Sequence, residues 1–471
     1  MSGTARSRQN DALMILYRKQ PSGVLHARRN FINTYNKYNA NPRRSGSDLI
    51  NVKKSWVLYD VANSAYILLV TSLIPIYFNR IANEGGLSDT EYLAYWSVAA
   101  SLVTFIMLFI GPALGSLSDR KGWRRPIFMA TVITGVLTCL VLGLPKWWIA
   151  FLIIFCIGKI AYNASLVIYD GMLIDVAKDE EMDALSSKGY ALGYIGSCLP
   201  FIACMVIVVL SDMEGLEDFP TVLTFYDAVS WSLVITGIWW LVMSLPLFRS
   251  YEQVHYNEVR TKTVSENLRY FSGTIKEIAK NKAIWLFMLA FFFYIDGVNT
   301  IIEVATAFGE AKGLGSVGLL GALLLTQVIA FPATLVMNKL AYRYGTHRII
   351  GASIVGYILI SIFALFLDNI AQFFIMAGCV GLFQGTIQAL SRSYFGRMVP
   401  KEKTGEYFGL LDVFSKGSTI IGTGSIAILA MITDSANAVP VVLIIVFSIG
   451  LLLFYLSTRE RIYDSPVGEK E

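Results

Sequence analysis

The chain has 471 residues and a formal net charge of +5, with 55% hydrophobic, 13% aromatic and 15% charged residues and a mean hydropathy of +0.56. Soluble globular proteins are about 45–50% apolar and about 25% charged, whereas the apolar residues here lie in long stretches that need a lipid environment. These values exclude a soluble enzyme, a disordered protein and a disulfide-rich scaffold, and they predict a polytopic membrane protein.

The first 54 residues form a basic segment whose only acids are Asp11 and Asp48. The segment lacks the short apolar core and the small-residue cleavage site of a signal peptide, so the first apolar helix is predicted to be an uncleaved anchor. We expect residues 1–54 to be a disordered cytoplasmic tail attracted to anionic lipid. A targeting or partner-binding role and a later start at Met14 are the alternatives.

Twelve apolar stretches follow, and each is close to the length of about 20 residues that a membrane crossing requires. They cover residues 56–78, 92–117, 126–144, 147–170, 184–210, 225–248, 283–308, 314–340, 349–367, 370–395, 405–432 and 439–457. The longest polar interval, 249–282, is predicted to be a cytoplasmic loop between two six-helix halves at 55–248 and 283–458. The sequence therefore predicts an all-α membrane protein with a short cytoplasmic tail at 459–471.

The Lys and Arg residues are distributed unevenly between the predicted loops. With a cytoplasmic N-terminus, the cytoplasmic segments hold 34 of the 39 Lys and Arg residues and the outer loops hold 3, while Lys159 and Lys416 lie inside helices. Without the N-terminal tail the ratio is still 23 to 3. Cytoplasmic loops of membrane proteins carry an excess of positive charge, so both termini are predicted to be cytoplasmic.

Three short patterns recur in the same order in the two halves. Residues 60–64 (DVANS) correspond to 296–300 (DGVNT), 120–125 (RKGWRR) to 343–348 (RYGTHR), and 189–193 (GYALG) to 405–409 (GEYFG). Duplicated halves explain this order, and two parallel six-helix halves around a cavity are the plan of a major facilitator transporter. One feature opposes strict symmetry, because Asp60 follows Trp56 by four residues whereas Asp296 lies about 13 residues into its stretch. Either the first helix begins earlier or the two carboxylates lie at different depths.

Residues 115–125 (GSLSDRKGWRR) resemble the signature loop between helices 2 and 3 of the major facilitator superfamily, with Trp123 in place of the first basic residue after the glycine. Further strings resemble one family within it: WVLYDVANSAY (56–66), GYALGYIGS (189–197), FFFYIDGVNTIIEVATAFG (291–309), LLLTQVIAFPATL (323–335) and GLFQGTIQALSRSYFGRMVP (381–400). That family is the autophagy-related vacuolar amino-acid effluxers with their bacterial relatives, also called the unknown major facilitator family. The resemblance runs from Trp56 to Arg461 and implies a major facilitator fold and amino-acid export. The short loops are more similar to the bacterial branch, which implies the bacterial cell membrane, or the vacuolar membrane in a eukaryotic host.

Polar side chains inside the predicted helices are the candidates for substrate binding. A charge in a bilayer interior costs at least a few kcal/mol and is usually retained for a cavity, a partner or a relay. Two faces at related positions of the halves carry such side chains at helical spacing; they are Asp60, Asn63 and Ser64 in the first half and Asp296, Asn299, Thr300 and Glu303 in the second. Asp296 lies deepest, so burial is expected to favour its neutral form and to let it alternate between a proton and a substrate ammonium group. The alternative is that these residues hold helices together.

Further candidates offer a cation and amide groups for an anionic part of the substrate. They are Lys159 and Asn163 in the fourth stretch and Gln384 and Gln388 in the tenth. For Lys159, snorkelling or pairing with an acid is equally consistent with the sequence. Asp412 and Lys416 are four residues apart and are predicted to neutralise each other.

The signature loop is predicted to act as a gate. Asp119 is expected against the N-terminus of the helix at 405–432, where the helix dipole favours a negative charge. Arg120 and Arg124 are expected to meet acids at neighbouring helix ends such as Asp175, and Arg392 is assigned to the same gate. Such contacts would join the halves in one orientation and release them in the other. The alternative is a basic cluster that only sets topology.

The remaining motifs restrict the class of function. The five cysteines (Cys139, Cys156, Cys198, Cys204 and Cys379) form no CxxC pair and are predicted to be free thiols. Nothing resembles a nucleotide-binding loop, a zinc motif or a nucleophile elbow, so we expect no cofactor, metal, nucleic-acid partner or enzymatic activity. The sequence predicts a secondary transporter of a small polar metabolite, an amino acid by resemblance, with protons as the coupling ion. The alternative is a sensor or scaffold with the same fold that lacks transport.

Overall fold

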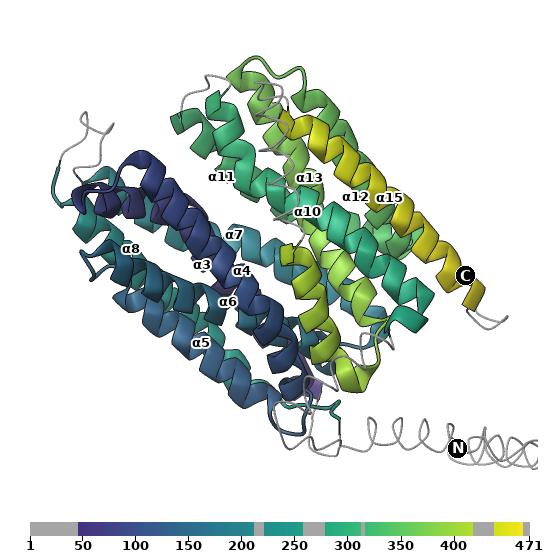
Figure 1. Ribbon diagram of the computed structural model, residues 1–471. Coiled ribbons are helices and arrows are strands. Elements are labelled where there is room, and N and C mark those ends of the chain that lie inside the picture. Colours follow the sequence, from purple (N-terminus) through teal and green to yellow (C-terminus); the bar gives the residue numbers. More distant parts are fainter. Residues whose placement is uncertain (1–45, 212–220, 258–277, 312–315, 418–437, 465–471) are drawn as a thin grey trace, which may run out of the picture. The chain divides into compact units, whose positions relative to one another are not determined.

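The computed structural model describes residues 46–211, 221–257, 278–311, 316–417 and 438–464. Residues 52–471 form one unit, separate from residues 1–51. The first half comprises α3 (Gly46–Glu84), α4 (Asp89–Ser118), α5 (Arg124–Val141), α6 (Trp148–Val176), α7 (Met182–Val209) and α8 (Phe225–Ser250). The second comprises α10 (Lys282–Ala311), α11 (Ser316–Tyr344), α12 (Thr346–Ala364), α13 (Ile370–Gly396), a helix over 404–417 and α15 (Ala438–Asp464). Figure 1 shows the halves as two bundles of long helices.

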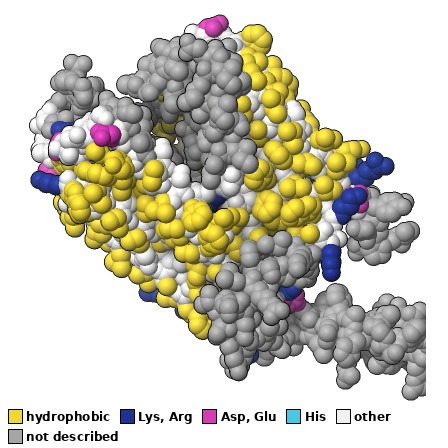
Figure 2. Space-filling model, viewed as in Figure 1, with side chains coloured by type: hydrophobic (Ala, Val, Ile, Leu, Met, Phe, Trp, Pro, Cys, Tyr) yellow, Lys and Arg dark blue, Asp and Glu magenta, His cyan; other side chains and the backbone are white. Residues whose placement is uncertain are grey.

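Eleven helices in the described part of the chain are long and apolar enough to cross a membrane. They coincide with eleven of the twelve predicted stretches, and the predicted all-α fold is confirmed. The remaining stretch, 405–432, is described as a helix to residue 417, and its other residues lie outside the described part. Figure 2 shows the face that such a fold presents to lipid, on which apolar side chains predominate and Lys and Arg lie near the margins.

The first helix begins earlier than its apolar stretch. α3 starts at Gly46, ten residues before Trp56, so the last residues of the predicted tail are helical; residues 1–45 lie outside the described part. Asp60 and Asp296 each follow the first residue of their helices by fourteen positions. The earlier start of the first helix is therefore confirmed, and the two carboxylates lie at matching positions of their helices.

Local signals in the sequence set several helix ends. At α4, the Ser88 hydroxyl accepts a hydrogen bond from the Glu91 amide while the Glu91 carboxylate accepts one from the Ser88 amide at 2.9 Å, which is a capping box. Asn369 caps α13 by accepting from the Gln372 amide at 3.0 Å. The tight loops before α5 and α12 turn at Gly122 (φ +77°) and Gly345 (φ +92°), where a left-handed backbone requires glycine. Both loops thus contain a glycine with positive φ at corresponding positions of the internal repeat, although the first loop spans residues 119–123 and the second is Gly345 alone.

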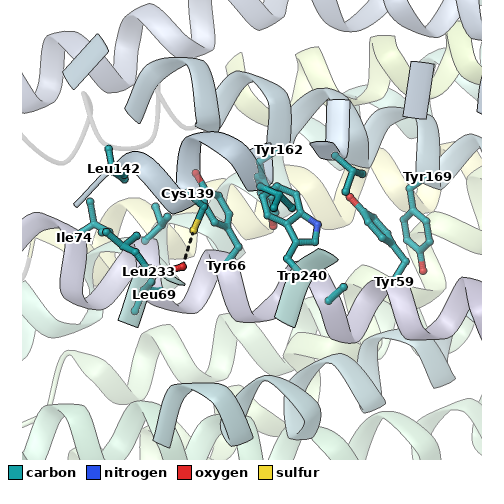
Figure 3. Close-up of a cluster of buried hydrophobic side chains, with 14 of the residues drawn as sticks. Tyr59, Tyr66, Leu69, Ile74, Cys139, Leu142, Tyr162, Tyr169, Leu233 and Trp240 are labelled. Carbon is teal, nitrogen blue, oxygen red and sulfur yellow. Dashed lines mark hydrogen bonds between the residues drawn. The ribbon is translucent and has the colours of Figure 1, made fainter. Parts of the chain in front are cut away.

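Each half has its own aromatic core. In the first half, the rings of Tyr66 and Trp240 lie 4.9 Å apart, and Figure 3 shows this cluster between α3, α5, α6 and α8. The thiol of Cys139 donates to the Leu233 carbonyl at 3.4 Å, so this free cysteine is part of the packing. In the second half, Tyr357 stacks on Phe447 at 5.0 Å. Two separately packed cores leave the boundary between the halves as the place where polar groups gather.

Candidate substrate site and gate

A buried arginine joins the two halves. Arg392 on α13 forms ion pairs with Asp60 of α3 at 3.1 Å and with Asp170 of α6 at 3.2 Å. It also donates from Nε to the Ser186 hydroxyl at 2.9 Å, and its guanidinium lies 4.5 Å from the centre of the Tyr190 ring. Arg392 and Asp60 are buried, whereas Asp170 is partly exposed. A cation from one half is therefore neutralised by acids of the other half.

Two glycines let α7 approach this centre closely. A methyl group at Gly189 would lie 2.0 Å from a carboxylate oxygen of Asp60, and one at Gly193 would lie 2.7 Å from the Ser64 hydroxyl. The GxxxG spacing of the first half is thus a packing site against α3. Asn63, on the same face of α3, donates to the carbonyl of Tyr59 in its own helix at 2.8 Å.

The side-chain amides of Gln388 and Gln384, one and two turns before Arg392 on α13, also face the first half. The Tyr194 hydroxyl of α7 donates to the Gln388 side chain at 2.7 Å, and Gln384 is buried one turn earlier on α13. A methyl group at Gly385 would lie 2.7 Å from the Tyr194 ring, so the two helices are in direct contact. Gln384, Gln388 and Arg392 therefore form one stripe of α13, and the structure brings these three predicted residues together with Asp60.

The other predicted substrate residues occupy separate positions. Asp296 and Thr300 are buried on α10, and Asn299 donates to the Ser415 hydroxyl at 3.4 Å. Glu303 lies in α10, but its side chain is outside the described part. On α6, Asn163 is buried and the Lys159 ammonium lies 5.4 Å from the centre of the Tyr162 ring.

The signature loop contacts the second half as its sequence suggested. The Asp119 carboxylate accepts hydrogen bonds from the amides of Gly405 at 2.8 Å and Glu406 at 2.9 Å, at the start of the helix over 404–417. Arg124 pairs with Asp119 and, at 2.8 Å, with Asp175. Arg120 lies beside Asn257 in an isolated β-bridge. We call the contact of Asp119 and Arg124 with residues 404–406 the latch.

Small residues allow this contact. The backbones of α4 and the helix over 404–417 meet so closely that a methyl group at Gly115 would lie 2.1 Å from the Gly405 carbonyl oxygen, and one at Gly409 would lie 2.8 Å from that of Gly111. Two GxxxG motifs thus pack face to face across the boundary. On the same helix, Asp412 and Lys416 form the predicted ion pair.

Two further ion pairs across the boundary were absent from the sequence prediction. Arg397 pairs with Asp183 at 2.8 Å, and Lys401 pairs with Asp179 at 2.9 Å. Asp183 also accepts from the hydroxyl of Thr346, the first residue of α12. The internal repeat pairs residues 343–348 with the signature loop, and each of these two segments contacts the start of a helix of the other half: Asp183 near the start of α7, and residues 404–406.

Comparisons with known proteins identify the family. The family model described as "Vacuole effluxer Atg22 like" matches residues 51–463. The uncharacterized MFS-type transporter YxiO of Bacillus subtilis is 35% identical over 88% of this chain and 96% of its own length. Autophagy-related protein 22 of Eremothecium gossypii is 21% identical over 78% of this chain and 75% of its own.

A solved structure supports the same fold. The crystal structure of the E. coli fucose:proton symporter FucP superposes with a TM-score of 0.63 at 12% identity, covering 88% of this chain and 99% of that one. At this identity the similarity extends to the fold alone, which is that of a multi-pass membrane transporter. The family match and the two-bundle fold together show that the chain belongs to the Atg22-like family of major facilitator transporters.

Proposed function

We propose that this secondary transporter carries a small metabolite with a carboxylate group, an amino acid, and that Arg392 binds that carboxylate. The observation that supports the proposal is the buried guanidinium of Arg392 held by acids of the other half. A guanidinium binds carboxylates in a bidentate, charge-assisted geometry, so a substrate carboxylate can take the place of Asp60 or Asp170. The choice of an amino acid rests on the family resemblance.

Replacement of an internal acid by the substrate links binding to alternating access. In the described conformation the aspartates of the first half neutralise Arg392 and hold the halves together. A substrate that neutralises Arg392 removes the need for this pairing, because an uncompensated buried charge is costly whereas a paired one is tolerated. Released Asp60 is then free to take the substrate ammonium group.

We further propose that Asp296 carries the coupled proton. The residue is buried at the position in α10 that corresponds to Asp60 in α3, and a carboxyl group inside a membrane helix is usually retained for a cavity, a partner or a relay. FucP, which shares this fold, is a fucose:proton symporter, so the fold is compatible with proton coupling. For this chain, the proposal of proton coupling rests on Asp296 itself.

Ligand binding and transport test the two proposals separately. A thermal-shift screen of the purified protein compares amino acids with the matching amines and carboxylic acids, since a ligand of the folded state raises its apparent stability. We expect a shift from amino acids that Arg392→Gln abolishes and that Asp368→Asn, a change at an exposed position, leaves intact. Shifts that persist in Arg392→Gln would refute its role in binding.

Uptake into proteoliposomes at several pH values tests the coupling. We expect Asp296→Asn to fold and insert, since it is nearly isosteric and removes a buried charge, and to lose proton-driven uptake while retaining substrate exchange. Asp60→Asn is the comparison, because it alters the partner of Arg392. Normal uptake with an unchanged pH profile in Asp296→Asn would show that this carboxylate only holds helices together.

A further inference from the structure

The segment that follows α8 packs under the signature loop. We call residues 251–257 the strap. The Gln253 side chain accepts a hydrogen bond from the Gly122 amide at 2.8 Å and donates to the Ser118 carbonyl at 3.0 Å. The Asn257 amide donates to the carbonyl of Asp119 at 2.7 Å. The strap therefore binds main-chain groups at both ends of the loop that carries Asp119.

A second set of contacts fixes the strap to α6. The buried Asp175 carboxylate accepts from the hydroxyl of Tyr251, from the amide of His255 at 2.9 Å and from the Nδ1 of the same histidine at 2.9 Å. Because a carboxylate only accepts, Nδ1 carries a hydrogen. Asp175 also pairs with Arg124, which in turn pairs with Asp119. The strap thus contacts both of the aspartates that Arg124 joins, Asp175 through its carboxylate and Asp119 through its main chain.

These contacts bear directly on the position of Asp119. Ser118 and Asp119 are buried, and a main-chain carbonyl that loses its partner in a buried place is costly, so the loop conformation that presents Asp119 depends on the donors that Gln253 and Asn257 supply. The Arg124 guanidinium is shared between two carboxylates, and the strap orients one of them. All of these partners belong to the first half or directly follow it, so they can stay together when the second half moves away.

We propose that Gln253 and His255 are positioning residues of the transport gate. They hold the loop over 118–124 so that Asp119 meets the amides of residues 405 and 406 when the halves close on this side. The strap thereby sets the stability of the latch through the signature loop. The proposal concerns the gate and does not depend on which substrate is carried.

Hydrogen–deuterium exchange of the purified full chain tests the proposal without a substrate. The variants are Gln253→Ala and His255→Ala, and the matched control is Val254→Ala, because a valine side chain cannot hydrogen-bond. We expect amide exchange at Gly405 and Glu406 in the other half to rise on the order of threefold to tenfold in both alanine variants, the effect of one lost hydrogen bond. Val254→Ala should match the wild type.

A conservative variant separates positioning from general destabilisation. His255→Asn retains a donor near the place of Nδ1, so we expect it to restore most of the protection at Gly405 and Glu406. Exchange in the interior of α12 reports global unfolding and should not change. Faster exchange that is confined to residues 118–124 in the alanine variants would overturn the proposal, and so would an Asn variant that behaves as His255→Ala does.

Discussion

A methyl group at Gly405 should prevent the latch from closing fully. In the structure an added Cβ would lie 2.5 Å from the Gly115 carbonyl oxygen, 2.5 Å from the Ser118 hydroxyl and 2.8 Å from an Asp119 carboxylate oxygen. The first is a backbone atom and the second belongs to a short side chain, so α4 and the helix over 404–417 must separate. Overpacking of this kind costs about 1–3 kcal/mol. Because it arises only in the closed state, we expect Gly405→Ala to shift the population toward the open latch by about 5- to 150-fold.

Gly417→Ala is the matched control on the same helix, because a Cβ there meets no atom within 4 Å. Alanine also favours a helix over glycine by up to about 1 kcal/mol, but that gain acts in the open and closed states alike. The comparison of the two variants therefore isolates the contact across the boundary between the halves.

Spin labels at Glu180→Cys and Glu402→Cys measure the opening, in a background without the five native cysteines. Both positions are exposed, and they adjoin the Asp179–Lys401 pair between the halves. We expect one short distance to dominate in the wild type and in Gly417→Ala, and a longer distance to dominate in Gly405→Ala. Identical distance distributions in the two alanine variants would refute the argument that glycine packing limits closure.

Three further predictions use the same labels or simple tags. Burial raises the pKa of the Asp119 carboxyl from 3.8 to about 6, because desolvation outweighs the attraction of Arg124. The closed latch therefore binds this proton more tightly than an open, hydrated one, and the short label distance should gain population as the pH falls from 7.5 through 6. Asp119→Asn should abolish this effect. Asp183→Asn should lengthen the distance because Arg397 and Thr346 lose a charged partner, and a distribution like that of the wild type would contradict this. Tags at residues 1 and 471 should both resist protease added outside intact cells, and an exposed tag at either end would refute the even number of crossings.

The helices and several contacts follow from the sequence because they depend on local pattern. Hydropathy predicts the spans, and the helix dipole predicts that a carboxylate at Asp119 lies against the amides of residues 405 and 406. The start of α3 was misjudged because the polar residues before Trp56 continue the helix beyond its apolar stretch. Composition shows where a helix is apolar but not where it begins.

The pairings across the boundary could not be predicted in the same way. Asp60 and Arg392 were both identified, yet they lie 332 positions apart, and only the packing of α7 between α3 and α13 brings them together. Asp183 and Arg397 resemble ordinary charges at helix ends. The strap was treated as part of a polar loop, since its contacts run through main-chain groups and through the side chains of Tyr251, Gln253 and His255, which follow no sequence pattern.

Three of the ion pairs that α13 and the residues after it make with the first half differ in their access to water. The side chains are 42% and 46% exposed in Lys401–Asp179, 17% and 19% in Arg397–Asp183, and 5% and 8% in Arg392–Asp60. An exposed pair contributes about 0–1 kcal/mol, whereas loss of one partner of a buried pair costs about 3–5 kcal/mol. Among these three pairs, Arg392–Asp60 therefore offers the largest resistance to separation of the halves. A substrate that takes the place of Asp60 would remove this resistance at the residue that we propose to bind it, so the contact that most strongly opposes opening is the one that the substrate can replace.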